Sequence, residues 1–259
     1  MGSGENTTEK YLQMLENMAQ QYKQPNIKVV CVGGAGTHCG EYLYEQQLDN
    51  TQVILVNGDW ESMKTKEANT KILLAKNVSE KLAGAGGHPE VGQHCLELGL
   101  YEVQDKLKNS DIIFVVAGLG GGFGSGALPS VAKLAKDNSS VVIGIEITPF
   151  DVESRNHVDT TVDQMEAICD VNIVLENQRL MEIAPEASIS EAFNIMNKLV
   201  LGVVKEIKDR FSVDYFRVFK KDVASISKES EYQLQVELES TAEQKKEPVV
   251  QVEPISLVA

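Results

Sequence analysis

The sequence has 259 residues, of which 42% are hydrophobic and 24% charged, as expected of a globular protein with a sizeable core. Its formal net charge of −14 argues against direct binding to nucleic acid or to anionic membranes. No apolar run is long enough for a membrane span, and the N-terminus lacks a signal-peptide pattern. We therefore expect a cytoplasmic protein whose four cysteines are reduced and mostly buried.

Strands and helices are predicted to alternate along the chain, after a short amphipathic helix that ends before Pro25. Apolar runs rich in β-branched residues predict buried strands at Ile27–Val32, Gln52–Val56, Lys71–Leu74, Ser110–Ala117, Ser140–Ile147 and Val171–Leu175. Helical periodicity predicts helices over 37–48, 90–108, 130–137, 153–168 and 188–210, the last opened by a capping box of Ser188 and Glu191. Such alternation predicts an α/β fold with a parallel sheet and right-handed crossovers.

Three glycine-rich loops, at 33–36, 84–87 and 118–126, are the strongest functional signal. The third has six glycines within nine residues and lies between a predicted strand and a predicted helix. Because each glycine costs backbone entropy, we reason that packing does not explain so many, and that backbone N–H groups approach a ligand. Phosphate is the natural ligand, since a helix dipole adds positive potential there. The first loop lacks the third glycine of a dinucleotide fingerprint, which argues against a Rossmann dinucleotide site.

Gly120–Gly126 resembles the GGGTG(T/S)G signature of the tubulin/FtsZ family. Further stretches resemble FtsZ segments in the same order: IKVVCVGGAG at 27–36, VNGD at 56–59, LAGAGGHPEVG at 82–92, ITPFDVES at 147–154, SISEAFNIMN at 188–197 and FSVDYFRV at 211–218. The resemblance implies a Rossmann-like parallel sheet flanked by helices, ending after the long core helix. We accordingly expect a helical N-terminal extension over 1–26, a GTP-binding domain over 27–224 and a polar, flexible tail over 225–259.

The resemblance also implies a site for GTP or GDP, with Mg²⁺ held through the nucleotide phosphates. The phosphates would lie against residues of the glycine loops, namely Gly33, Gly34, Ala35, Gly36, Ala85, Gly86, Gly87, Gly120, Gly121, Gly122, Phe123, Gly124, Ser125 and Gly126. The ribose and base would lie near Glu153, His38, Asn177, Phe193 and Asn197. Asn57 and Asp59 would lie near the phosphates or the metal ion, or else simply form a turn. Phe193 also fits a core position, and Glu153 a helix start.

Two residues near this site depart from the family pattern. Phe123 replaces a threonine that helps to hold phosphate, so any phosphate contact there comes from the backbone. Lys198 falls where the family has an aspartate that reads guanine, and a lysine has no hydrogen-bond acceptor. Asn197 is the substitute that the sequence offers for reading the base.

The segment that FtsZ proteins insert into a neighbouring subunit also differs. Asp214 matches the first acidic residue, but Ser212 replaces an asparagine and Arg217 replaces the second acid. An arginine cannot accept a proton from the attacking water, so we expect GTP hydrolysis to be weak or absent. The resemblance therefore assigns a catalytic role to Asp214 alone.

The resemblance implies an FtsZ-like cytoskeletal protein of cell division or membrane remodelling, assembling with itself or with a full-length relative. FtsZ proteins continue into a second sheet domain that has no counterpart here, so we expect the usual filament interface to be altered. The alternative is a non-polymerising, nucleotide-binding regulator that caps a filament and recruits a partner, such as a membrane adaptor, through its tail. A nucleotide-free scaffold is a third hypothesis.

Overall fold

The computed structural model describes residues 25–74, 84–138, 141–155, 157–183 and 185–211. All of them belong to one compact unit, Gln24–Ser212. The helix predicted before Pro25, the segment with Asp214 and the tail over 225–259 lie outside the described residues. Those three predictions therefore stay predictions.

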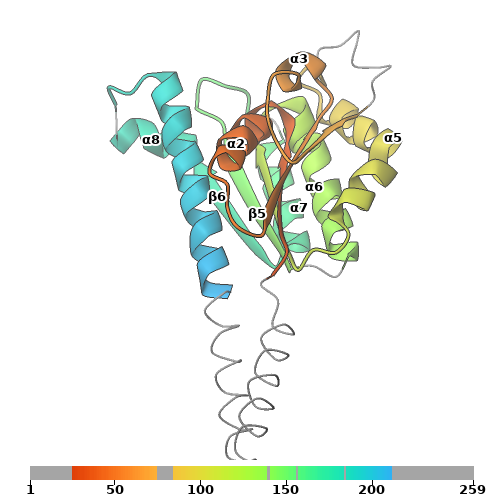
Figure 1. Cartoon of the computed structure of the whole chain (residues 1–259). Helices are drawn as coiled ribbons and strands as arrows, with labels where there is room; N and C mark the ends of the chain where they lie inside the picture. Colours follow the sequence, from red (N-terminus) through yellow and green to blue (C-terminus); the bar gives the residue numbers. More distant parts are fainter. Residues whose placement is uncertain (1–24, 75–83, 139–140, 156, 184, 212–259) are drawn as a thin grey trace, which may run out of the picture. The chain divides into compact units, whose positions relative to one another are not determined.

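The described residues form a six-stranded parallel sheet in the order β3-β2-β1-β4-β5-β6 (Figure 1). The strands are β1 (Ile27–Val32), β2 (Thr51–Asn57), β3 (Thr70–Leu73), β4 (Ile112–Gly118), β5 (Val141–Thr148) and β6 (Val171–Glu176). The first strand lies inside the sheet, where Ile27 is in register with Thr51 on one side and Ile112 on the other. The predicted α/β fold with a parallel sheet is confirmed.

Helices cover both faces of the sheet. They are α2 (Gly33–Glu45), α3 (Trp60–Met63), α5 (Pro89–Leu107), α6 (Gly122–Asp137), α7 (Val158–Ile168) and α8 (Asn177–Ile183), and residues 189–211 are also helical. Within the described ranges, no helix is long and apolar enough to cross a membrane.

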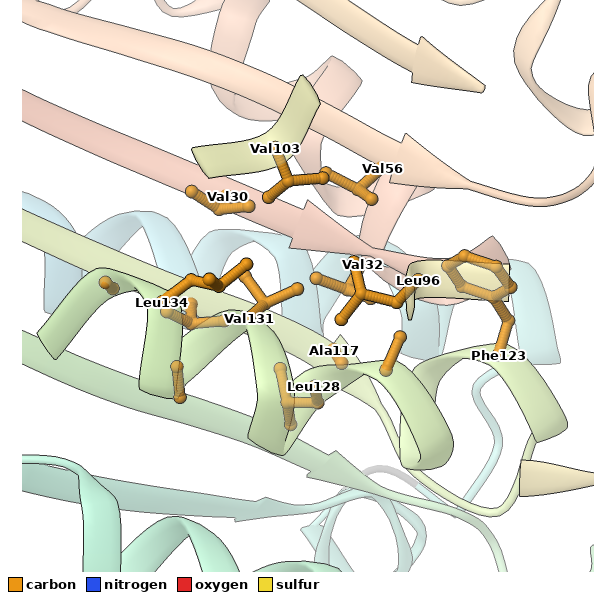
Figure 2. Packing of buried hydrophobic residues seen from close by; sticks show 14 of the residues in the cluster. Val30, Val32, Val56, Leu96, Val103, Ala117, Phe123, Leu128, Val131 and Leu134 are labelled. Carbon is orange, nitrogen blue, oxygen red and sulfur yellow. The ribbon is translucent and has the colours of Figure 1, made fainter. Parts of the chain in front are cut away.

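Two hydrophobic cores result, one on each face of the sheet. Along β1, Val30 and Val32 belong to the core beneath α5, α6 and α7, part of which Figure 2 shows. Val29 and Cys31 belong to the other core, together with residues of α2 and of the helix at 189–211. Successive side chains of a strand point to opposite faces, so a strand that is apolar throughout fits a sheet covered on both sides.

The largest correction concerns α6, which was predicted to begin near residue 130 but begins at Gly122. Its first turns are rich in glycine and contain Pro129, residues that conceal a helix in the sequence. Pro129 has no N–H to donate to the carbonyl oxygen of Ser125, and Thr161 Oγ1 of α7 approaches that oxygen to 3.5 Å instead. The predicted loop at 118–126 is thus half loop and half helix.

Other helix boundaries differ for local reasons. The helix predicted over 153–168 begins only at Val158, after His157 adopts a left-handed backbone with φ of 66°. The short helices α3 and α8 were not predicted. The capping box is confirmed, because the Ser188 hydroxyl accepts the Glu191 N–H while the Glu191 carboxylate accepts the Ser188 N–H.

Candidate functional site

A cleft lies at the carboxyl edge of the sheet, where ligands of open α/β folds bind. Its volume is about 360 Å³. It is lined by Gly34, Ala35, Asn57, Asp59, Gly84, Ala85, Gly86, Gly87, Gly118, Leu119, Gly121, Gly122, Phe123, Gly124 and Glu153. The three predicted glycine loops therefore meet at one place. Sequence reasoning missed Gly84, Gly118 and Leu119, which directly flank or lie within those loops.

Two helices begin at this cleft without a side-chain cap. Gly33 follows β1 directly and opens α2, whereas Gly122 opens α6 shortly after β4. Neither N-cap residue, Val32 or Gly121, offers a side-chain hydrogen bond to the helix. The first N–H groups of a helix need partners, and two such ends aimed at one cleft make a binding site for an anion.

The charged side chains around the cleft do not attract an anion. Among the described residues, no lysine or arginine lines the cleft, and the only carboxylates in its lining are those of Asp59 and Glu153. From the described part of the chain, an anion could therefore be held only by backbone N–H groups and helix dipoles. In such a site a metal ion that neutralises part of the ligand charge would be favourable.

Two kinds of loop glycine bear on the question of a ligand. For one kind, an added Cβ would lie closer than 3.0 Å to backbone atoms of the chain itself, as at Gly33, Gly36, Gly120, Gly122, Gly124 and Gly126. Packing therefore does explain these positions, and our inference from the sequence was wrong for them. Gly34 and Gly121 are different, because an added Cβ would meet nothing within 4 Å and neither has a positive φ. Both line the cleft, so the space a Cβ would fill fits a ligand.

Polar side chains near the cleft also have structural roles. Asn57 Nδ2 donates to Ser62 Oγ at 2.8 Å, and Asp59 Oδ1 accepts the N–H groups that begin α3. Ser125 Oγ accepts the Gly120 N–H at 3.0 Å and so closes the third loop on itself. The turn expected at Asn57 and Asp59 is thus present, and both residues line the cleft as well.

A group of aromatic rings continues the site beyond the cleft. The rings of His38 and Phe193 lie 6.5 Å apart, and those of Phe150 and Phe193 lie 6.2 Å apart, both edge-on. The backbone N–H of Phe150 donates to Glu153 Oε2 at 2.8 Å, which joins this group to the cleft. Phe150 was not predicted as a site residue, although its place just after the end of β5 was a usable signal.

The amide residues predicted near the base are buried on this side. Asn177 is 4% exposed, and its Oδ1 atom has no hydrogen-bond partner among the described residues. Asn197, also 4% exposed, follows Phe193 by one helical turn and so shares its face, whereas Lys198 is exposed. An unpaired buried acceptor is costly, so Asn177 fits a ligand that donates a hydrogen bond.

The cysteines match the sequence expectation of reduced, mostly buried thiols. All four cysteines are free, and three are buried. Burial raises the pKa of the Cys39 thiol to about 12, so this thiol stays protonated at neutral pH. No group of three His, Cys, Asp or Glu side chains in the described part of the chain could hold a metal ion. Ser212, Asp214 and Arg217 lie outside the described residues.

The structure is an α/β domain with a glycine-lined cleft at the carboxyl edge of its parallel sheet, and comparison with known proteins specifies its family. The model of the Tubulin/FtsZ family GTPase domain matches residues 26–185, so the chain belongs to this family. The chain is 36% identical over 197 residues to cell division protein FtsZ 2 of Haloferax volcanii, covering 75% of this chain and 49% of that protein. It is 32% identical to FtsZ 2 of Methanocaldococcus jannaschii, covering 76% and 52%. The chain spans about half the length of these curated relatives.

Solved structures show the same fold. An empty FtsZ dimer from M. jannaschii superposes with a TM-score of 0.66 at 26% identity, covering 81% of this chain and 59% of that one. A GTPγS-bound protofilament of CetZ2 from H. volcanii superposes with a TM-score of 0.63 over 73% and 59%. Because the CetZ2 chain is only 22% identical to this one, that comparison supports the fold alone. The family resemblance inferred from the glycine loops is confirmed.

Proposed function

We propose that this chain binds GTP or GDP in the cleft, with Mg²⁺ held through the phosphates. The observation that carries the proposal is the meeting of two uncapped helix N-termini with the open glycines Gly34 and Gly121. Backbone N–H groups there would bind the phosphates. Asp59, which lines the same cleft, would lie near the metal ion. Membership of the Tubulin/FtsZ GTPase family supports this choice of ligand.

The base would lie among the rings and amides beyond the cleft. Phe193 offers a partly exposed aromatic face, and Asn177 an acceptor that has no partner among the described residues. Guanine presents N–H donors at N1 and at its 2-amino group that such an acceptor can bind, whereas adenine has an acceptor at N1 and no amino group at C2. Lys198 has no acceptor to offer these donors, so the selection of guanine would depend on Asn177 and Asn197.

Calorimetric titration with GTP, GDP and ATP in the presence of Mg²⁺ tests this proposal, with Gly34→Ala and Gly202→Ala as a matched pair. Neither added Cβ would meet any atom of the chain, and both glycines lie in helices. Both variants should therefore be as stable as the natural chain or slightly more stable. Only Gly34→Ala places its methyl group in the cleft, and it should weaken guanine-nucleotide binding about tenfold or more.

Equal affinity of the two variants and the natural chain for nucleotide would show that the nucleotide does not contact Gly34. Absence of binding to all three nucleotides would leave the domain as a nucleotide-free scaffold. Equal affinity for ATP and GTP would refute the guanine selectivity but not the phosphate site.

We further propose that the protein acts in an FtsZ-type filament in cell division, with weak or absent GTP hydrolysis. Relatives named as cell division proteins and a solved FtsZ dimer support the filament. The replacement of an acidic residue by Arg217 supports slow hydrolysis. Sedimentation with GTP, alone and with a full-length relative, tests assembly. Binding at filament ends without co-assembly would instead favour the non-polymerising regulator, with its tail available for a membrane adaptor.

A further inference from the structure

Phe123 is the second residue of α6, at the point where that helix meets the cleft. The residue is 5% exposed and belongs to the core that contains Val32 and Leu96 (Figure 2). A phenyl ring has no group that could hold a phosphate by an ordinary hydrogen bond. Phe123 therefore contributes to the cleft through its backbone, and the role of its ring lies elsewhere.

The ring packs against the turn that follows β2. A Cβ on Gly58 would lie 2.9 Å from Cε2 and 3.1 Å from Cδ2 of Phe123, so glycine leaves the room that the ring needs. Asn57 and Asp59 lie on either side of Gly58 and line the cleft. The ring thus joins the start of α6 to a second wall of the same cleft.

Backbone contacts fix this turn of α6 from two further sides. A Cβ on Gly92 of α5 would lie 2.8 Å from the Cα atom of Phe123. A Cβ on Gly33, at the start of α2, would lie 2.8 Å from the backbone nitrogen of Gly124. Elements in such close contact resist small displacements, because packed interiors have few voids to move into.

We propose that Phe123 is a positioning residue that holds residues 118–126 in their binding geometry before a nucleotide arrives. The buried ring orders the loop both in the nucleotide-free protein and in the complex. A side-chain hydrogen bond to phosphate could order it only in the complex. A site ordered in advance loses less conformational freedom on binding, which favours affinity. The functional meaning rests on the proposed nucleotide site, but the ordering is a property of the nucleotide-free protein.

Hydrogen exchange of the nucleotide-free protein tests the proposal, with Phe123→Thr as the variant and Phe123→Leu as its apolar control. Within 118–126, the hydrogen-bonded amides of Leu119, Gly120 and Ser125 should be protected in the natural chain and exchange at least about tenfold faster in Phe123→Thr. Phe123→Leu should remain close to the natural chain. Protection of β1 should be the same in all three proteins, and GTP or GDP with Mg²⁺ should restore the protection lost in Phe123→Thr.

Two results would overturn the proposal. In the first, amides of 118–126 in the natural chain exchange as in a free peptide and become protected only with nucleotide, a result that needs no variant to fold. In the second, a folded Phe123→Thr variant protects 118–126 as well as the natural chain does. If no nucleotide binds, the proposed function fails, while the exchange of the nucleotide-free protein still decides the role of Phe123.

Discussion

Lys28 is an example of a charged residue built into the sheet. Although it lies on β1 and is 9% exposed, its Nζ atom donates to the carbonyl oxygens of Lys106 and Lys108 at 2.7 and 2.6 Å. These carbonyls end α5, where the helix dipole is negative and backbone acceptors lack partners. Burial and the nearby charge of Lys106 lower the pKa of Lys28. The ammonium group thereby fastens the end of α5 to the central strand.

Replacing Lys28 with methionine should destabilise the protein by about 1–3 kcal/mol, because two partly buried carbonyl acceptors lose a charged donor while the apolar stem is kept. Thermal unfolding of the variant at neutral pH measures this loss. Lys198→Met, at an exposed position of the helix at 189–211, serves as the control and should change stability by less than about 0.5 kcal/mol. Similar losses in both variants would show that the contacts with α5 contribute nothing specific.

At the scale of elements, β5, β6 and α7 enclose a group of polar atoms that the proposed function does not use. Glu146 on β5 is fully buried, and neither carboxylate oxygen has a partner among the described residues. The side-chain atoms of Asn172 on β6 are likewise buried without partners in this part of the chain. Burial raises the pKa of Glu146 to about 7, although the neighbouring Asn172 side chain lowers it, and the charge of Glu166 adds a smaller upward contribution. Keeping the carboxyl group neutral therefore favours the packing of these elements.

The consequence for stability has a definite sign. A carboxyl whose folded-state pKa is raised binds more protons in the folded than in the unfolded state between the two pKa values. The free energy of unfolding should therefore fall as pH rises from 4.5 to about 7, and the contribution of Glu146 should then level off. The shift corresponds to about 3 kcal/mol.

Glu146→Gln should remove this part of the pH dependence and make the protein more stable than the natural chain above pH 7. Urea unfolding of both proteins at several pH values measures the difference. Asp163→Asn, on the exposed side of α7, should keep the natural profile. Parallel profiles for Glu146→Gln and the natural chain would mean that Glu146 is solvated or paired in the folded protein.

At the scale of the whole molecule, the proposed assembly and hydrolysis would require a second copy of the chain. If Arg217 blocks hydrolysis in the way that the sequence predicts, Arg217→Asp should raise GTP turnover by at least about tenfold, and only where copies assemble. Phosphate release followed across protein concentration measures this. Arg217→Asp combined with Asp214→Asn should abolish the gain. Turnover that is independent of concentration would argue against a residue contributed by a neighbour.

The sheet and most of the cleft could be predicted from the sequence, because buried parallel strands are continuous apolar runs and ligands bind at their carboxyl ends. The start of α6 could not, since its first turn contains glycines whose fit depends on α5 and β4, such as Gly126 against Pro89. Phe150 was missed because its contact with Phe193 joins segments distant in the chain. The direction of the Phe123 ring likewise depends on Gly58, which no local pattern reveals.

The place of β1 in the sheet has a consequence for how the chain is made. It is the first described strand to leave the ribosome, yet one of its two neighbours, β4, follows only after α5. One edge of β1 therefore stays open while the intervening residues are synthesised, and such distant pairings slow folding. Residues 119–121, which follow β4, leave the ribosome directly after β4 and therefore when β4 can pair with β1. The nascent chain thus forms the cleft only when the centre of the sheet is complete.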